Sequence, residues 1–126
     1  MLDVTAAIIR QNNRVLICQR PEGKHNALLW EFPGGKIEPG ETGEACVIRE
    51  CQEELGLTLR VLGKLTTVQE GEGLRLHFYL AEILSGTPTR REHRALRWVT
   101  AEELPACKFC PADARMLRET DLRSLI

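Results

Sequence analysis

The chain has 126 residues, of which 43% are hydrophobic and 28% charged, and its formal net charge is −1. This length suffices for one buried core, so residues 1–126 are predicted to form a single domain. The balanced charge leaves no basic excess to hold a nucleic-acid polymer or a membrane surface, and no apolar run approaches the ~18 residues that span a bilayer.

The cysteines and the N-terminal segment bear on the compartment. Five cysteines are an odd count, which argues against a closed disulfide framework and fits a reducing environment. The opening segment, MLDVTAAIIRQNNR, lacks a basic stretch followed by a long apolar one, so it does not resemble a signal peptide. A cytoplasmic location is therefore expected.

Two strands are predicted at the start of the chain. Apolar and β-branched residues indicate strands over 3–10 and 14–20, and a hairpin-like break separates them at 11–13. A looser stretch with proline and glycine at both ends follows over 21–35.

A helix is predicted next, over 42–55. Thr42 is suited to the N-cap, and Gly56 is suited to ending the helix in a left-handed conformation. Two further strands are expected around 59–69 and 74–83, the second from its strict alternation of apolar and polar residues.

The last third of the chain is predicted to hold one strand and two helices. RALRWVT, 94–100, is a candidate strand, and Thr100 with Glu103 forms a capping box for a short helix that Pro105 would stop. A final helix is expected over 111–119. Strands mixed with a few helices in no regular alternation predict an α+β or mixed α/β sandwich.

The helix predicted over 42–55 carries an unusual amount of negative charge. Glu50, Glu53 and Glu54 share its polar face with Arg49, and each like-charged pair costs roughly 0.2–0.5 kcal/mol. Carboxylates late in a helix also oppose its dipole. Most acidic helical stripes are simply solvated, but a hard cation such as Mg²⁺ would remove this conflict by binding the carboxylate oxygens.

The loop ahead of the helix supplies the second part of the candidate site. Pro33-Gly34-Gly35 can bring bare backbone groups close to a ligand, where a side chain would block the approach. A metal-activated water with a carboxylate to take its proton is able to attack phosphorus. The residues alone therefore predict a metal-dependent site for a phosphate ester or anhydride.

The stretch from Gly35 to Leu57 resembles the Nudix box, G-x5-E-x7-R-E-U-x-E-E-x-G-U, where U is a bulky aliphatic residue. The only departure is Cys51, a small apolar residue expected to face the core. The segments CQRPEGKHNALLWEFPGGKIEPGET and FCPADARML are similar to the MutT branch of that family. The resemblance implies an α/β fold, an α/β/α sandwich around a mixed β-sheet with the box as loop–helix–loop. It also implies hydrolysis of a nucleoside triphosphate to the monophosphate and pyrophosphate.

The same resemblance implies catalytic and metal-binding roles by position in the motif. Glu50 is the candidate for activating water, and Arg49 and Glu41 would orient the carboxylates without reacting themselves. Glu92 corresponds to a carboxylate that the family brings from outside the box, although an exposed loop glutamate is the alternative. The implied ligands of Mg²⁺, or of Mn²⁺ in its place, are Gly34, Gly35, Glu50, Glu53, Glu54 and Glu92.

The substrate positions implied by the resemblance extend along the same segments. Arg20 could grip a phosphate bidentately or be a surface arginine, and His25 could contact the nucleotide or be solvated. Phe32 could flank a base or belong to the core. The full implied set is Arg20, His25, Glu31, Phe32, Gly34, Gly35, Lys36 and Asp113.

Asp113 bears on which base is bound, because the MutT pattern has an asparagine there. An ionised aspartate only accepts hydrogen bonds, which suits the exocyclic amine of cytosine or the N1–H and amino group of guanine. Protonation in a dry pocket would restore a donor, and an ordinary first-turn helix acid is the alternative.

Three functions follow, in order of preference. The first is Mg²⁺-dependent cleavage of 8-oxo-dGTP type, and the second is hydrolysis of CTP or a modified dCTP by the same chemistry. The third is a nucleotide-binding or sensor domain without turnover, which the complete set of box carboxylates disfavours. The expected partner is a small nucleotide, and the protein is expected to be a monomer or homodimer.

Overall fold

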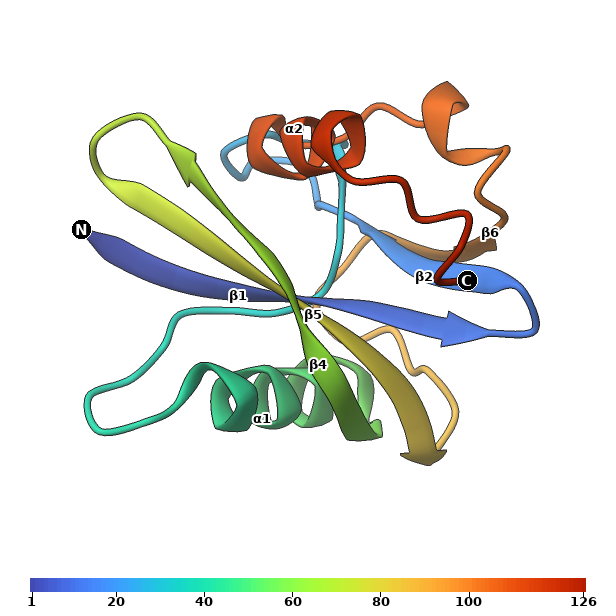
Figure 1. Ribbon diagram of the computed structural model, residues 1–126, viewed down its shortest axis with the longest axis horizontal. Coiled ribbons are helices and arrows are strands. Elements are labelled where there is room, and N and C mark those ends of the chain that lie inside the picture. The colour runs from blue at the N-terminus through green and yellow to red at the C-terminus, as the bar shows by residue number, and fades with distance from the viewer.

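The computed structural model describes residues 1–126 as a mixed β-sheet covered by helices on both faces (Figure 1). Helix α1 lies against one side of the strands and helix α2 against the other. The predicted mixed α/β sandwich is confirmed. The elements are β1 Leu2–Gln11, β2 Arg14–Gln19, β3 Trp30–Glu31, α1 Gly43–Leu55, β4 Thr58–Glu70, β5 Leu74–Ser85, β6 Ala95–Val99, the 3₁₀ helix η1 Leu104–Ala106 and α2 Pro111–Glu119.

The central strand β1 explains the two-sided architecture. It pairs in parallel with β5 and antiparallel with β2, and β4 completes one edge beside β5. Ala6 and Ile8 pack into the core beneath α2, whereas Ala7 and Ile9 pack against α1. Because successive side chains of a strand point to opposite faces, a strand apolar at both parities must be covered on both sides.

Strand β2 organises the smaller half of the sheet. It joins β1 through a tight turn in which Asn12 and Asn13 adopt φ values of 51° and 63°, as hairpin turns require. Strand β3 pairs with β2 on one side, with Cys18 opposite Glu31, and β6 pairs with β2 on the other. The end of β2 is therefore the point at which β3 and the chain entering β6 meet.

Both predicted ends of helix α1 are confirmed. The Thr42 hydroxyl accepts a hydrogen bond from the Ala45 N–H at 3.1 Å, and Gly56 adopts a φ of 70°. Cys51 faces the core and is fully buried, as expected. None of the helices combines the length and apolar character that crossing a bilayer requires.

One strand was not predicted and one prediction was wrong. The segment 21–35, expected to be a looser stretch, contains the two-residue strand β3, which is too short to show any periodicity. Pro105 was expected to stop a helix, whereas it lies inside η1 near its start, where its missing N–H leaves no bond unmade. The capping box itself forms: the Thr100 N–H donates to Glu103 Oε1 at 2.9 Å, and the Glu103 N–H donates to Thr100 Oγ1 at 3.3 Å.

Candidate active site

The double glycine lies against β1 and against helix α1. The Thr5 N–H donates to the Gly35 carbonyl at 2.8 Å. A side chain at Gly34 would collide with the Thr5 backbone, and one at Gly35 would collide with the carboxyl group of Glu50. The backbone contact therefore requires glycine at 34, and glycine at 35 leaves the space that the Glu50 carboxyl group occupies.

The two glycine carbonyls differ in what they have left to offer. The Gly35 carbonyl accepts hydrogen bonds from the Thr5 N–H, from the Thr5 hydroxyl at 3.2 Å and from the Cys46 thiol at 3.4 Å. The Gly34 carbonyl accepts none within the chain. Of the two carbonyls implied as metal ligands, that of Gly34 is the one with free lone pairs.

Glu54 is the most buried carboxylate of helix α1. Its side chain belongs to a residue that is 6% exposed, and Oε1 has no hydrogen-bond partner. Burial, followed by the charges of Glu50 and Glu31, raises the pKa of Glu54 to about 9. The sequence places Glu54 on a polar face, but this part of the face turns toward the double-glycine loop instead of solvent. In the metal-free protein Glu54 is consequently protonated at neutral pH.

Arg49 is the cationic centre of the acidic face. It donates from Nε and Nη2 to the two oxygens of Glu41 at 2.7 and 3.0 Å, and from Nη1 to Glu50 at 2.8 Å and Glu53 at 3.2 Å. The bonds from Arg49 lower the pKa of Glu41 to about 2, whereas burial raises the pKa of Glu50. Glu53 is the most solvated of these carboxylates, with its side chain 59% exposed. The Arg49–Glu41 pair thus has the geometry to orient Glu50 and Glu53.

Glu92 reaches this region from the loop that joins β5 to β6. Arg91 fastens the loop to α1, because its Nη1 donates to two carbonyls in the last turn of the helix at 3.1 and 3.2 Å. A guanidinium there complements the negative end of the helix dipole, a role that no residue of the helix itself supplies. Glu92 is exposed, and its charge contributes to the raised pKa of Glu50 and of Glu54. The importance of Arg91 could not be seen in the sequence, where it is one of several arginines.

Arg20 belongs to a network at the end of β2. Its Nε donates to the His25 carbonyl at 2.7 Å, and its Nη1 donates to Glu31 Oε1 at 3.2 Å. Glu31 Oε2 lies 3.2 Å from Nε2 of His93, a residue that is only 6% exposed. Nothing in the polar run RREHR distinguishes His93 as a buried residue.

The remaining implied substrate positions divide between surface and core. The side chains of His25 and Lys36 are exposed. Phe32 is 3% exposed; its ring stacks on Phe109 with centroids 5.4 Å apart and meets Phe78 edge-on at 6.5 Å. Of the two alternatives for the Phe32 ring, the structure supports the core residue.

Asp113 is buried at the start of α2, at 3% exposure. Its Oδ1 accepts a hydrogen bond from the Phe32 N–H at 3.1 Å. Burial raises the pKa of Asp113 to about 7, although the hydrogen bond from Phe32 acts in the opposite direction. Asp113 does lie in the first turn of α2, as the alternative to a base-binding role expected, but it is buried. Its carboxyl group can exist in either protonation state near neutral pH.

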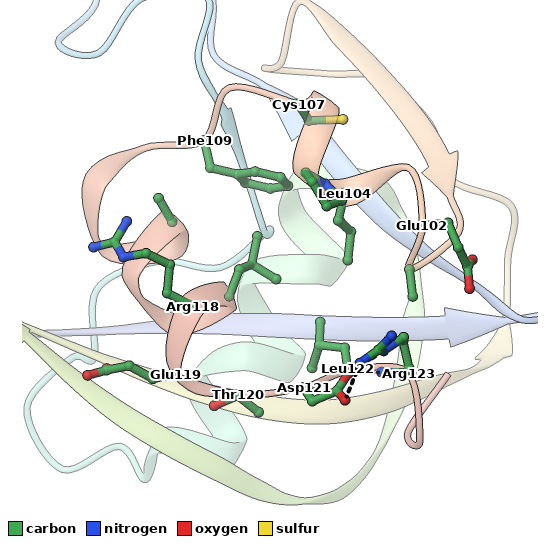
Figure 2. A pocket seen from close by; sticks show the side chains of 14 residues that line it. Glu102, Leu104, Cys107, Phe109, Arg118, Glu119, Thr120, Asp121, Leu122 and Arg123 are labelled. Carbon is green, nitrogen blue, oxygen red and sulfur yellow. Dashed lines mark hydrogen bonds and ion pairs between the residues drawn. The ribbon is translucent and has the colours of Figure 1, made fainter.

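A cavity of about 730 Å³ opens elsewhere, between η1, α2 and the C-terminal residues (Figure 2). Leu104, Phe109 and Leu117 supply part of its apolar wall. One of its two arginines, Arg123, is paired with Asp121 at 3.1 Å, so these two charges satisfy each other. None of the implied catalytic, metal or substrate residues lines this cavity, and buried unpaired groups mark the carboxylate site instead.

Comparison with known proteins identifies the family. The family model described as NUDIX domain matches residues 1–120. The chain is 38% identical over 120 residues to the CTP pyrophosphohydrolase of Escherichia coli, covering 93% of this chain and 89% of that protein. It is 39% identical over 116 residues to the 8-oxo-dGTP diphosphatase of Escherichia coli, covering 89% and 90%. The crystal structure of the MutT NUDIX hydrolase from Burkholderia pseudomallei matches with a TM-score of 0.83 at 32% identity, covering 94% of this chain and 97% of that one. The chain therefore belongs to the Nudix family, in its MutT-like branch of hydrolases.

Hydrolases of this family act on small nucleotides and need a divalent metal, and the residues present fit such an ion. No three His, Cys, Asp or Glu side chains converge as a ready-made site. However, Glu54 Oε1 is a buried acceptor without a partner, the backbone of Gly34 contacts the Glu54 carboxyl group, and the Gly34 carbonyl accepts no hydrogen bond. The pKa values of Glu50 and Glu54 are both raised, by burial and by the neighbouring carboxylates. Such shifts are expected of a carboxylate cluster that lacks a bound cation. Oxygen donors of this kind suit a hard divalent cation.

Proposed function

We propose that the protein hydrolyses a nucleoside triphosphate to the monophosphate and pyrophosphate, with Mg²⁺ as the metal and Mn²⁺ as a substitute. The observation that carries the proposal is the buried Glu54 carboxyl, whose Oε1 lacks a partner and whose pKa is raised to about 9 next to the double-glycine loop. A buried carboxyl group with an unpartnered oxygen lowers the stability of the fold unless a cation binds it. The Nudix box and the names of the relatives support the same chemistry.

The metal, when bound, would neutralise phosphate charge and lower the pKa of a water molecule. The proposed ligands are the side chains of Glu50, Glu53, Glu54 and Glu92 and the Gly34 carbonyl. Glu50 is the proposed acceptor of the proton from the attacking water, which fits a carboxylate whose pKa is raised by burial. Arg49 and Glu41 are proposed to hold Glu50 and Glu53 in position, in line with their hydrogen bonds.

Oxidised guanine is the first candidate base, and cytosine is the second because of Asp113. With a pKa raised to about 7, the Asp113 carboxyl can donate a hydrogen bond when protonated and only accept when ionised. The protonated form suits a base edge that needs both a donor and an acceptor, as the first candidate does. The ionised form suits an amino group such as that of cytosine. The relatives include enzymes named for each substrate.

The proposal includes a cytoplasmic enzyme that acts as a monomer or homodimer. Five cysteines, all free of disulfides, suit a reducing compartment. His25, Lys36 and Arg20 are proposed to contact the nucleotide from the exposed rim, and Phe32 is proposed to contribute its backbone.

A release assay tests the function. The protein with Mg²⁺ should release pyrophosphate from at least one member of a panel of oxidised purine and cytosine triphosphates, with the monophosphate as the other product. The Glu54→Gln variant should lose at least about a hundredfold in turnover, whereas Glu44→Gln, an exposed change in the first turn of the same helix, should not. Nucleotide binding without any release would instead support the sensor domain. Hydrolysis in ¹⁸O-labelled water would show whether the α or the β phosphorus is attacked.

A further inference from the structure

His93 is a buried polar group whose presence the proposed chemistry does not yet explain. Its Nδ1 and Glu54 Oε1 are the buried side-chain polar atoms without a hydrogen-bond partner. The next residue, Arg94, donates its N–H to the Gln19 carbonyl at 2.9 Å, and β6 then pairs with β2 from Ala95 onward. The sheet therefore holds the backbone of His93 at the end of β2.

The imidazole of His93 supplies the second of two hydrogen-bond partners for the Glu31 carboxylate. Its Nε2 lies 3.2 Å from Glu31 Oε2, while Arg20 Nη1 donates to Oε1 at 3.2 Å. A carboxylate accepts and does not donate, so Nε2 carries a proton in this contact. Each oxygen of Glu31 is thus engaged by the protein itself.

Arg20 is left with one part of its guanidinium free. Nε is used by the His25 carbonyl at 2.7 Å and Nη1 by Glu31, whereas Nη2 makes no hydrogen bond within the chain. The side chain of Arg20 remains 29% exposed. Two of its nitrogen atoms are therefore held by the chain, and the third keeps two N–H donors available for a ligand oxygen.

We propose that His93 is a positioning residue, which holds Glu31 so that Glu31 in turn orients Arg20 toward an anionic or carbonyl oxygen of the nucleotide. Glu31 then acts within the protein and does not contact substrate. An isolated, partly exposed Arg–carboxylate pair adopts several geometries, and a buried third partner on the carboxylate restricts them. The inference rests on the proposed function, because it concerns the grip on that substrate.

Substitutions at His93 separate positioning from a merely structural role. His93→Ala should raise KM by on the order of tenfold to a hundredfold and change kcat less than about threefold, because Arg20 would bind ground state and transition state alike. His93→Gln should recover KM to within about threefold of wild type, since its amide nitrogen can occupy the place of Nε2. His93→Asn, whose amide lies nearer the place of Nδ1, should behave like His93→Ala. His77→Gln, on β5, is the matched control and should leave KM unchanged.

A double substitution tests the path through Arg20. Arg20→Ala should raise KM, and adding His93→Ala to it should raise KM no further, because the group that His93 positions is already gone. If the two substitutions each raise KM by their full single-variant factor in the double variant, the inference is overturned. A wild-type KM in His93→Ala, or equal recovery of KM by the Gln and Asn variants, would overturn it as well. If His93→Ala does not fold, the comparison of His93→Gln with His93→Asn carries the test.

One readout does not depend on turnover. In ¹H–¹⁵N spectra of the wild-type protein, His93 should show a slowly exchanging Nε2 proton, and Glu31→Gln should make that proton exchange faster. An exposed, rapidly exchanging imidazole would overturn the inference. If the wild-type protein turns over no nucleotide, the proposed function fails, and this spectrum still decides whether His93 holds Glu31.

Discussion

Replacing Glu54 by Gln should make the metal-free protein more stable while making the enzyme inactive. Burial raises the pKa of Glu54 from 4.5 to about 9 in the folded state. The folded protein therefore binds more protons than the unfolded chain between these values, and the free energy of unfolding falls as pH rises through that window. The side chain of the Gln variant cannot ionise, so its free energy of unfolding does not fall with pH for this reason.

The magnitude follows from the difference between the two protonation states. At pH 7 the unfolded carboxyl is ionised and the folded one is not, and each pH unit above 4.5 costs the fold ~1.4 kcal/mol. The free energy of unfolding of the variant should thus exceed that of the wild type by about 3 kcal/mol at pH 7 and by little near pH 4.5. For a domain of this size this is a shift in Tm on the order of 10 °C.

Urea denaturation in EDTA at several pH values between 5 and 8 measures the effect. The other titrating groups contribute equally to the free energy of unfolding of both proteins, so they cancel in the difference between variant and wild type. This difference should grow steadily with pH. Added Mg²⁺ should then stabilise the wild type more than the variant, because the ion favours the ionised carboxylate. Parallel pH curves would refute the claim that Glu54 is held neutral in the fold, and wild-type turnover in the variant would refute its role as a metal ligand.

Four further predictions concern other parts of the site. Cytosine triphosphates should gain on oxidised purine triphosphates as pH rises through about 7, where Asp113 ionises, and Asp113→Asn should abolish this dependence; an unchanged pH profile would remove Asp113 from base selection. Gly35→Ala should lower turnover by on the order of a hundredfold with the circular dichroism spectrum retained, because the new methyl group displaces Glu50; normal turnover would argue against that close packing. Arg91→Ala should lower the free energy of unfolding by about 1 kcal/mol and reduce turnover, whereas Arg123→Ala, another exposed arginine, should do neither; equal effects would argue against a clamp on α1. EDTA should stop the reaction and Mg²⁺ or Mn²⁺ should restore it, so activity that persists in EDTA would contradict a metal-dependent site.

Local features of the sequence predicted most of the secondary structure. The caps at Thr42 and Gly56 bounded helix α1, and the alternation over 74–83 identified β5, because each depends on residues close together in the chain. Strand β3 was missed because two residues carry no period, and Pro105 was misjudged because proline is compatible with the first turn of η1.

The sequence by itself also determined the chemistry that this protein could attempt, because carboxylates at fixed spacing after two glycines define a set of oxygen ligands on one helix. Only the tertiary structure decided how each of those groups behaves. Glu54 is buried because the double-glycine loop lies beside it, Asp113 because α2 packs over Phe32, and His93 because β6 carries it to Glu31, 62 residues earlier in the chain. Burial and pKa depend on neighbours that are distant in sequence, and no periodicity within a segment can reveal what will cover it.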